Sequence, residues 1–561
     1  MNKIKQKHLT QFALLLVIIV ITNVLGQYVF HRFDLTAEKR YTLSAASKQL
    51  LGKVTDVVYV RVYLDGEFPA GFQRLRNETK EMLDEFRVIA GDNVQYEFIN
   101  PSESTDPKQR NEIYENLAKK GLQPTNLQTN SDNGQQQQII FPGALLTYQN
   151  REIPIQLLKS MVGASPEVML NNSINDLEYE ITNALRKVID QNDRPIVGFL
   201  EGHGELSRQE TNDLAGSVRE YYDIKRVQIN GKLGALNKYK AIVIAAPDSA
   251  FNEKDKFVID QYIMGGGKVV WLIDGAYASM DSLSTNTASM VVSNQTNLDD
   301  QLFRYGVRIN HNVLQDMQCA VIPIVSGYVG NQPQTRMYPW MYMPLIFQTV
   351  KHPLVNNLNA VKLEFASTID TLPVPNVSKQ ILLTSSVFSR VVTTPARIGL
   401  GQATTPLKQE QFNASSLPVA VLLSGSFTSN FKNRVPILLS TDSTIQFKAT
   451  STPTSMIVVS DGDIAKNYVS KNGKIYPLGF DRYTREQFGN KAFLLNAINY
   501  LCGDEALISI RSREVNLRLL DKTKIKIEKL TWQLINVAVP VLLILILGIV
   551  LYVLRKRKYS K

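Results

Sequence analysis

The chain has 561 residues, of which 44% are hydrophobic and 20% are charged, so it can bury several cores and is not a disordered polymer. Its formal charge of +11 would suit a nucleic-acid-binding protein, but eight of the basic residues lie in two terminal tails that contain no acidic residue. The rest of the chain is close to neutral, and we therefore expect no nucleic-acid partner.

Two apolar segments predict membrane-spanning helices at the ends of the chain. Residues 12–30 and 534–554 contain no charged side chain, and each is long enough to cross the bilayer core. A cleaved signal peptide is the alternative for the first segment, but A-x-A is absent, and Tyr28, Phe30 and Phe33 resemble an aromatic interface belt. Because short basic tails stay in the cytoplasm, we expect both termini inside and the bulk of the chain outside.

Residues 31–160 are predicted to form a first α/β domain in the order βαβαββ. Alternating residues 57–65 predict a strand, a hairpin turns near residues 149–150, and the polar stretch 128–138 predicts a loop. This order resembles a thioredoxin-like sandwich, but without C-x-x-C it implies no redox chemistry. An amphipathic linker helix is expected over residues 173–190, with Ser173 as its N-cap.

The second domain is predicted to be a doubly wound α/β domain in two parts, residues 193–278 and 452–510. It opens with the uninterrupted apolar strand 196–200, which is typical of a buried parallel sheet, and its strands then alternate with helices. Residues 279–451 are rich in Ser, Thr, Asn and Pro and predict a β-rich insertion with mobile loops. The full predicted order is a cytoplasmic tail (1–11), a span (12–30), the first domain (31–160), a linker helix (161–192), the second domain with its insertion (193–510), a stalk (511–533), a span (534–554) and a cytoplasmic tail (555–561).

Two short motifs carry the candidate site residues. The sequence Glu201-Gly202-His203-Gly204-Glu205 follows a predicted parallel strand, where α/β sheets place ligands. His203 could there hold a raised pKa or bind a metal or a partner, but a hydrogen-bonded turn is the simpler explanation. The sequence Asp461-Gly462-Asp463 could likewise form a metal or ligand site at a strand end, but a simple turn is the favoured interpretation. We therefore take five residues as speculative ligand- or partner-binding groups and predict no metal site, cofactor or catalytic residue: Glu201, His203, Glu205, Asp461 and Asp463.

Further patterns limit the chemistry. The nucleophile elbow G-x-S-x-G, its cysteine counterpart and the Walker motif GxxxxGK[ST] are all absent, so hydrolysis by those routes is not expected. Cys319 and Cys502 are too few for a disulfide framework; we expect small buried residues, with a single pair as the alternative. The aromatic run 339–344 predicts core packing or, less simply, an exposed contact surface.

Four stretches in this order resemble the GldG family of gliding-motility-associated ABC transporter subunits of Bacteroidetes: residues 32–51, 199–207, 241–274 and 489–513. The resemblance implies a multi-span permease (GldF-like) and a cytoplasmic ATPase (GldA-like) as partners, the bacterial inner membrane as location, and a periplasmic bulk. It also implies an amidotransferase-like second domain that lacks the nucleophile and is shared with an intraflagellar-transport subunit. Asp274-Gly275 stands where the family usually has an acidic residue and Pro.

The function expected from these patterns is a non-enzymatic membrane-anchored ABC transporter subunit, with a substrate-binding role in the family's usual naming and no identified substrate. Two alternatives remain: an envelope hydrolase or metal-dependent enzyme that uses Glu201, His203 and Asp461, and a structural envelope scaffold.

Overall fold

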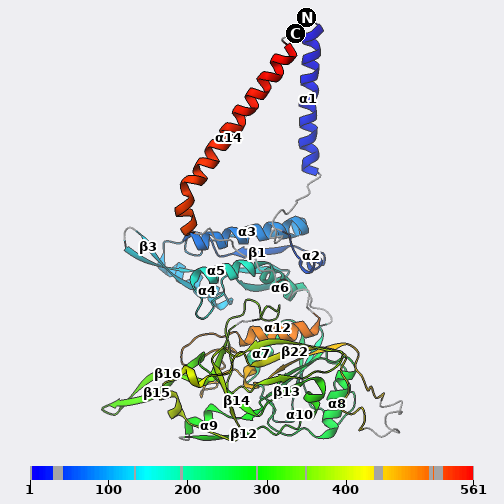
Figure 1. The fold of residues 1–561 in the computed structure, drawn as a ribbon, viewed down its shortest axis with the longest axis vertical. Helices are drawn as coiled ribbons and strands as arrows, with labels where there is room; N and C mark the ends of the chain where they lie inside the picture. The colour runs from blue at the N-terminus through cyan, green and yellow to red at the C-terminus, as the bar shows by residue number, and fades with distance from the viewer. Residues whose placement is uncertain are drawn as a thin grey trace. The chain divides into compact units, whose positions relative to one another are not determined.

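A computed structural model describes residues 3–28, 42–131, 134–189, 194–285, 288–347, 350–434, 446–503, 510 and 522–559 of the chain (Figure 1). It is a mixed α/β protein whose backbone divides into one unit over Met1–Glu514 and a second over Val515–Lys561. Residues 32–41, 504–509 and 511–513, which contribute to the family resemblance, lie outside the described residues, as does the first part of the predicted stalk, residues 511–521.

The first domain contains a four-stranded mixed sheet of order β2-β1-β5-β6, in which β1 and β2 are parallel and the other neighbours antiparallel. Val58, Val60 and Val62 alternate into its core, which explains why this segment forms a strand. The hairpin turn falls at Gln149, as expected, with a positive φ of 52°. The elements are α2 (Ala45–Leu51), β1 (Val58–Val62), α3 (Ala70–Ala90), β2 (Val94–Phe98), α4 (Pro107–Lys119), β5 (Gly143–Tyr148) and β6 (Arg151–Gln156).

The polar stretch expected to be a loop is instead part of an antiparallel hairpin. Strand β3 (Thr125–Ser131) pairs with β4 (Gly134–Ile140) along its whole length. A two-stranded ladder needs only backbone hydrogen bonds, so a Gln-rich sequence without apolar alternation can form it and escape a prediction from periodicity.

The linker is also different from the expectation, because it contains two helices, α5 (Pro166–Asn175) and α6 (Leu177–Ile189). Ser165 caps α5, with its side chain accepting a hydrogen bond from the Val168 amide, and Pro166 occupies the first turn. Ser173 lies inside α5 and donates to the Met169 carbonyl oxygen at 2.7 Å, so it is not the N-cap.

The second domain is built on a seven-stranded sheet of order β19-β22-β23-β10-β9-β7-β8. The five strands from β23 to β8 are parallel to their neighbours, whereas β22 and β19 are antiparallel. If these five strands are numbered by their order in the chain, their order across the sheet from β8 to β23 is 2-1-3-4-5. The order reverses between β7 and β9, which places a topological switch point there. The strands are β7 (Ile196–Leu200), β8 (Asp223–Val227), β9 (Ala241–Ala245), β10 (Val269–Leu272), β19 (Val377–Thr384), β22 (Pro418–Gly425) and β23 (Thr454–Val459).

Helices cover both faces of this sheet, as a doubly wound fold requires. Adjacent residues of β9 point to opposite sides: Val243 joins the core under α7 (Asn212–Arg219) and α12 (Asn490–Cys502). Ile244 joins the core under α8 (Glu253–Met264) and α10 (Asp299–Tyr305). This two-sided burial explains the uninterrupted apolar strands.

The segment expected to be an insertion contributes directly to this sheet, because β19 and β22 both lie within residues 279–451. The remaining strands of the segment pair in small sheets, one of which includes β11 (Ala276–Tyr277) from just before the segment: β12 (Ser289–Ser293), β13 (Val307–Ile309), β14 (Asn312–Asp316), β15 (Cys319–Val329), β16 (Gln332–Ile346), β17 (Val361–Lys362), β18 (Ile369–Thr371), β20 (Ser389–Thr393) and β21 (Ala396–Ile398). Trp340 and Tyr342 of the aromatic run are buried, so its central part is core rather than contact surface. Cys319 and Cys502 form no disulfide with each other.

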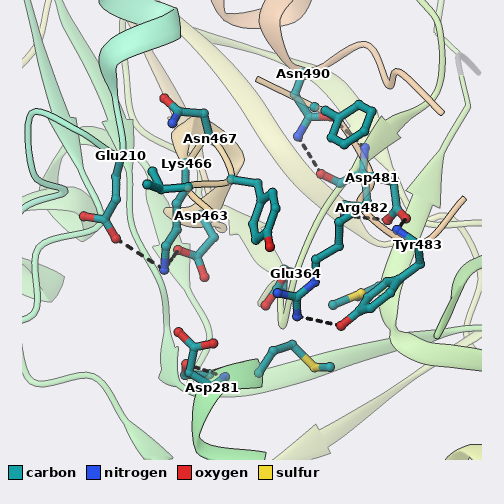
Figure 2. Close-up of a pocket in the computed structure, with 18 of the residues that line it drawn as sticks. Glu210, Asp281, Glu364, Asp463, Lys466, Asn467, Asp481, Arg482, Tyr483 and Asn490 are labelled. Atoms are coloured by element: carbon teal, nitrogen blue, oxygen red, sulfur yellow. Dashed lines mark hydrogen bonds and ion pairs between the residues drawn. The ribbon is translucent and has the colours of Figure 1, made fainter. Parts of the chain in front are cut away.

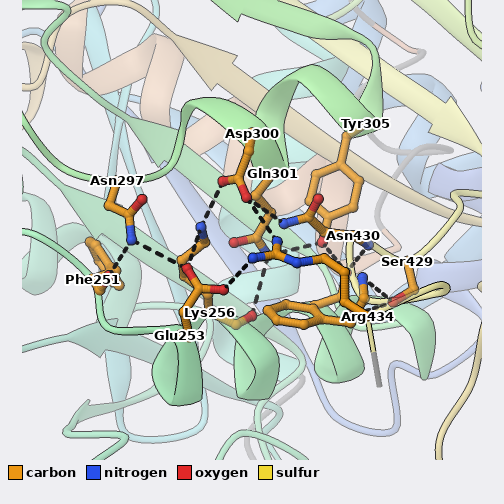
Figure 3. Close-up of polar contacts among 12 residues, drawn as sticks. Phe251, Glu253, Lys256, Asn297, Asp300, Gln301, Tyr305, Ser429, Asn430 and Arg434 are labelled. Atoms are coloured by element: carbon orange, nitrogen blue, oxygen red, sulfur yellow. Dashed lines mark hydrogen bonds and ion pairs between the residues drawn. The ribbon is translucent and has the colours of Figure 1, made fainter. Parts of the chain in front are cut away.

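A polar cluster ties α8 and α10 to the segment that follows β22 (Figure 3). The ammonium group of Lys256 is buried and lies 3.0 Å from Glu253 Oε1 and 2.7 Å from Asp300 Oδ1. Arg434 binds the same two carboxylates at 2.9 and 3.1 Å. The buried charge of Lys256 is thus paired, and the cluster holds these elements together.

The terminal helices are α1 (Lys3–Tyr28) and α14 (Lys522–Tyr559). Among the described residues, the stretch Ile527–Arg557 of α14 is the one helix long and apolar enough to span a membrane. The apolar part of α1, Thr10–Asn23, is shorter. α14 continues through Pro540.

Candidate functional site

The Glu201–Glu205 motif forms the turn that leaves β7 beside the topological switch point. Gly202 and Gly204 have φ values of 128° and 75°, which L side chains rarely adopt. A Cβ on Gly204 would lie 1.5 Å from Oδ1 of Asp248, in the loop after β9. The His203 carbonyl oxygen accepts hydrogen bonds from the amides of Asp248 and Ser249 at 3.1 and 3.0 Å. Gly204 therefore allows the turn to pack directly against the neighbouring loop.

The His203 side chain is held between two carboxylates and is 6% exposed. Nδ1 lies 3.2 Å from Glu205 Oε1, Nε2 lies 3.1 Å from Asp255 Oδ2 on α8, and the ring stacks on Phe251 at 3.7 Å. Burial opposes the charged form, but the hydrogen bonds and charges of Glu205 and Asp255 outweigh it and raise the pKa of His203. Both ring nitrogens thus contact carboxylates of the protein. We call this arrangement of His203, Glu205 and Asp255 the His203 clasp, because it joins the turn to α8.

The two carboxylates of the motif do not converge on one point. Glu205 accepts a second hydrogen bond, from the His203 amide at 2.7 Å. Glu201 instead forms ion pairs with Arg208 and Arg226, at 3.5 and 3.7 Å. The three candidate residues are therefore separated into the buried contacts of His203 with Glu205 and the partly buried ion pairs of Glu201.

The second motif lies with other acidic residues at the carboxyl ends of β10 and β23. Asp274, after β10, accepts a hydrogen bond from the Gly462 amide at 2.7 Å. Asp461 is fully buried and accepts hydrogen bonds from the amides of Glu364 and Ile464, at 2.7 and 3.2 Å. These bonds join the ends of two strands and the segment after β17 into one acidic centre.

The pKa values of the carboxyl groups in this centre are raised above their ordinary values. Burial, and next the charge of Asp463, raise the pKa of both Asp274 and Glu364 to about 7. Burial and the neighbouring carboxylates also raise the pKa of Asp461 well above its usual range, and burial raises that of Asp463. Near neutral pH these groups share protons, because several adjacent negative charges in a low-dielectric site repel one another.

A pocket with a cavity volume of about 370 Å³ opens beside this centre (Figure 2). Of the five residues proposed from the sequence, Asp463 lines it, whereas Glu201, His203, Glu205 and Asp461 do not. Sequence reasoning missed its other charged residues, which come from segments far apart in the chain: Glu210, Asp281, Lys362, Glu364, Lys466, Lys471, Asp481 and Arg482.

Two of the pocket's lysines are neutralised by carboxylates in its wall. Lys466 Nζ lies 3.4 Å from Asp463 and 3.7 Å from Glu210. Lys362 Nζ lies 2.9 Å from Asp481. Within the described part of the chain, no three His, Cys, Asp or Glu side chains are arranged to hold a metal ion. The pocket is suited to polar, charge-directed binding.

Comparisons with known proteins place this chain among transport proteins. The sequence model of a family described as an ABC-type uncharacterized transport system matches residues 194–497, and that of a domain of unknown function matches residues 37–147. An uncharacterized protein of Borreliella burgdorferi is 22% identical over 99% of both chains. A solved structure titled mmIFT52 N-terminal domain matches with a TM-score of 0.32 and 12% identity, covering 55% of this chain and 97% of that one. Because the first of these models matches more than half of the chain, the protein belongs to the family of ABC-type uncharacterized transport systems.

Proposed function

We propose that this protein is a non-enzymatic, membrane-anchored auxiliary subunit of an ABC transporter. The observation that carries the proposal is the family match, which covers the α/β domain from β7 to within α12. In this proposal the subunit binds a multi-span permease like GldF and a cytoplasmic ATPase like GldA, and the complex acts in gliding motility or envelope transport. The finer assignment rests on the GldG resemblance of the sequence.

The anchor in this proposal is α14, with α1 as a second span. Side chains from Leu542 to Leu547 are all apolar and between 54% and 70% exposed, so this stretch of α14 is apolar on all its faces. A helix of this kind needs lipid or a partner protein around it. The basic run after residue 554 fits a cytoplasmic end, and the proposal therefore places both termini in the cytoplasm and residues 31–533 in the periplasm.

The proposal assigns no catalytic role to the Glu201–Glu205 turn. Its support is that both ring nitrogens of His203 face carboxylates of the protein itself. A general base or metal ligand needs one nitrogen directed toward the substrate or the ion.

Co-purification tests this function. The tagged full chain is isolated from its own host membranes in mild detergent, and its partners are identified by mass spectrometry. We expect an ABC permease and an ATPase in near-stoichiometric amounts. A tagged, unrelated membrane protein with two terminal spans is the control. Isolation of the chain alone, under conditions in which a known ABC complex stays intact, would refute the proposal.

A further inference from the structure

The pocket beside the acidic centre also contains charged side chains that form no ion pair within the described residues: Glu364, Arg482 and the exposed Lys471. Lys362 and Lys466 are each paired, as described above. Glu364 and Arg482 both line the pocket (Figure 2), yet neither forms an ion pair within the residues that the structure describes. A carboxylate and a guanidinium that face one pocket without neutralising each other leave both charges available to a ligand.

Arg482 is oriented by aromatic side chains. Its guanidinium carbon lies 5.1 Å from the ring centre of Tyr468 and 4.7 Å from that of Tyr483. One nitrogen donates a hydrogen bond to the Tyr483 hydroxyl at 2.6 Å. These contacts position the guanidinium without cancelling its charge, and its remaining N–H groups suit a planar carboxylate.

Glu364 is positioned through its backbone. Its amide donates to Asp461 at 2.7 Å, which ties the residue to the end of β23. Burial and the charge of Asp463 raise its pKa, whereas the charges of Lys362, Lys466 and Arg482 lower it. A bound cation would relieve the repulsion among these carboxylates, which gives Glu364 a reason to prefer a positively charged group.

We propose that the pocket binds a small zwitterion, an amino acid or short peptide, with its carboxylate on Arg482 and its ammonium group on Glu364. A cavity of about 370 Å³ is at the small end of ligand sites, which run from about 300 to 1,000 Å³. Met280, Met343 and Phe480 add apolar surface for a ligand side chain. This inference goes beyond the transporter role and does not rest on it.

Three matched probes test the proposal on the full chain in detergent, by isothermal titration calorimetry. L-phenylalanine carries both charges, phenethylamine lacks the carboxylate, and 3-phenylpropanoate lacks the ammonium group. The other L-amino acids and L-alanyl-L-alanine extend the zwitterion set. We expect saturable binding of at least one zwitterion, about tenfold or more tighter than its two single-charge analogues.

Two variants test which side chain binds which charged group of the ligand. Arg482→Gln is expected to weaken zwitterion binding about tenfold and to leave the amine analogue unaffected, while Glu364→Gln does the same and leaves the carboxylate analogue unaffected. Arg304→Gln and Glu410→Gln, both exposed and outside the pocket, are the controls and should bind as wild type.

Three results would overturn the proposal: no zwitterion binds at millimolar concentration, the wild type binds an analogue as tightly as its zwitterion, or folded Glu364 and Arg482 variants keep wild-type affinity. The wild-type comparison among probes stands even if a variant does not fold. Zwitterion binding would support this inference whether or not the co-purification experiment recovers a permease, so the two proposals can fail independently.

Discussion

The carboxylate of Asp274, at the end of β10, accepts a hydrogen bond from the backbone amide of Gly462, in the turn after β23, at 2.7 Å. This bond joins the ends of two neighbouring parallel strands and holds a buried acid where its charge is unfavourable. It also links the acidic centre to the pocket, because Asp463 belongs to the same turn and lines that pocket.

Asp274→Asn is expected to stabilise the protein at high pH. The folded pKa of Asp274, about 7, is above its ordinary value of 3.8, so the native state binds more protons than the unfolded state between these values. Stability from this group is therefore complete below about pH 4 and lost as pH rises through 7. Asparagine keeps the acceptor for Gly462 and removes the charge.

Thermal melts at pH 4 and pH 8 check this prediction. Asp274→Asn should raise the melting temperature at pH 8, by an amount equivalent to about 1–3 kcal/mol, and have little effect at pH 4. The exposed Asp92→Asn change is the control. A lower melting temperature of Asp274→Asn at pH 8 would mean that the ionised carboxylate stabilises the fold.

Zwitterion binding is expected to strengthen from pH 6 to pH 8. The pKa of Glu364 is raised to about 7, so the carboxylate that would bind an ammonium group becomes charged in this interval. The charged groups that act on it include Asp463, Lys362, Lys466 and Arg482, and Glu364 also interacts with the carboxyl groups of Asp274 and Asp461. Calorimetric titrations across this range should show a several-fold gain in affinity. In Glu364→Gln the gain should disappear; an unchanged pH profile in that variant would exclude Glu364 as its source.

His203→Ala is expected to destabilise the fold without altering the pocket. The change removes two hydrogen bonds and the stacking on Phe251, and it leaves the buried carboxylates of Glu205 and Asp255 without their cationic partner. We expect a loss of about 2–4 kcal/mol in folding stability and unchanged zwitterion affinity.

The comparison variant for this experiment is His311→Ala. The imidazole of His311 is 38% exposed, so its removal should lower the folding stability less than that of His203. If His203→Ala instead abolished a turnover or the binding of a metal ion while leaving stability intact, the clasp would be a catalytic or metal site.

Gly462→Ala is expected to disturb the acidic centre through steric overlap. A Cβ at this position would lie 2.4 Å from the Cβ of Ala246 and 2.7 Å from Asp274 Oδ2. The ends of β9, β10 and β23 would have to separate, at a cost of about 1–3 kcal/mol, with weaker ligand binding. Gly216→Ala, in α7 with no atom near its would-be Cβ, should be neutral or slightly stabilising. Equal melting temperatures for both variants would contradict the close approach of the three strands.

Local pattern was sufficient to predict the centre of the second domain. The uninterrupted apolar run at β7 indicated a strand buried on both faces, and the alternation with helices indicated a parallel sheet. The antiparallel strands β19 and β22 were missed as parts of that sheet. Their pairing joins segments that lie far from β10 in the chain, and no local period specifies such a partner.

The candidate site was also predictable only in part: the place of its motifs in the sheet could be inferred from the sequence, but the arrangement of its side chains could not. The Glu201–Glu205 turn and Asp463 follow strands, so their position at the carboxyl edge could be inferred. The direction of the His203 ring could not, because it depends on Asp255 in a helix 52 residues later. Glu364 and Arg482 occur in sequence without any motif around them, and only the tertiary fold brings them to one pocket.

The most direct test of the transporter role is photo-crosslinking from α14 in living cells. A photo-reactive amino acid is placed in turn at residues 542–547, which cover every face of the helix, and at the exposed Arg304 as a control outside it. We predict adducts with a multi-span ABC permease from one face of α14 and none with it from residue 304. If all positions 542–547 gave no protein adduct, or adducts with unrelated proteins from every face, the helix would not dock on a permease and the account would be contradicted.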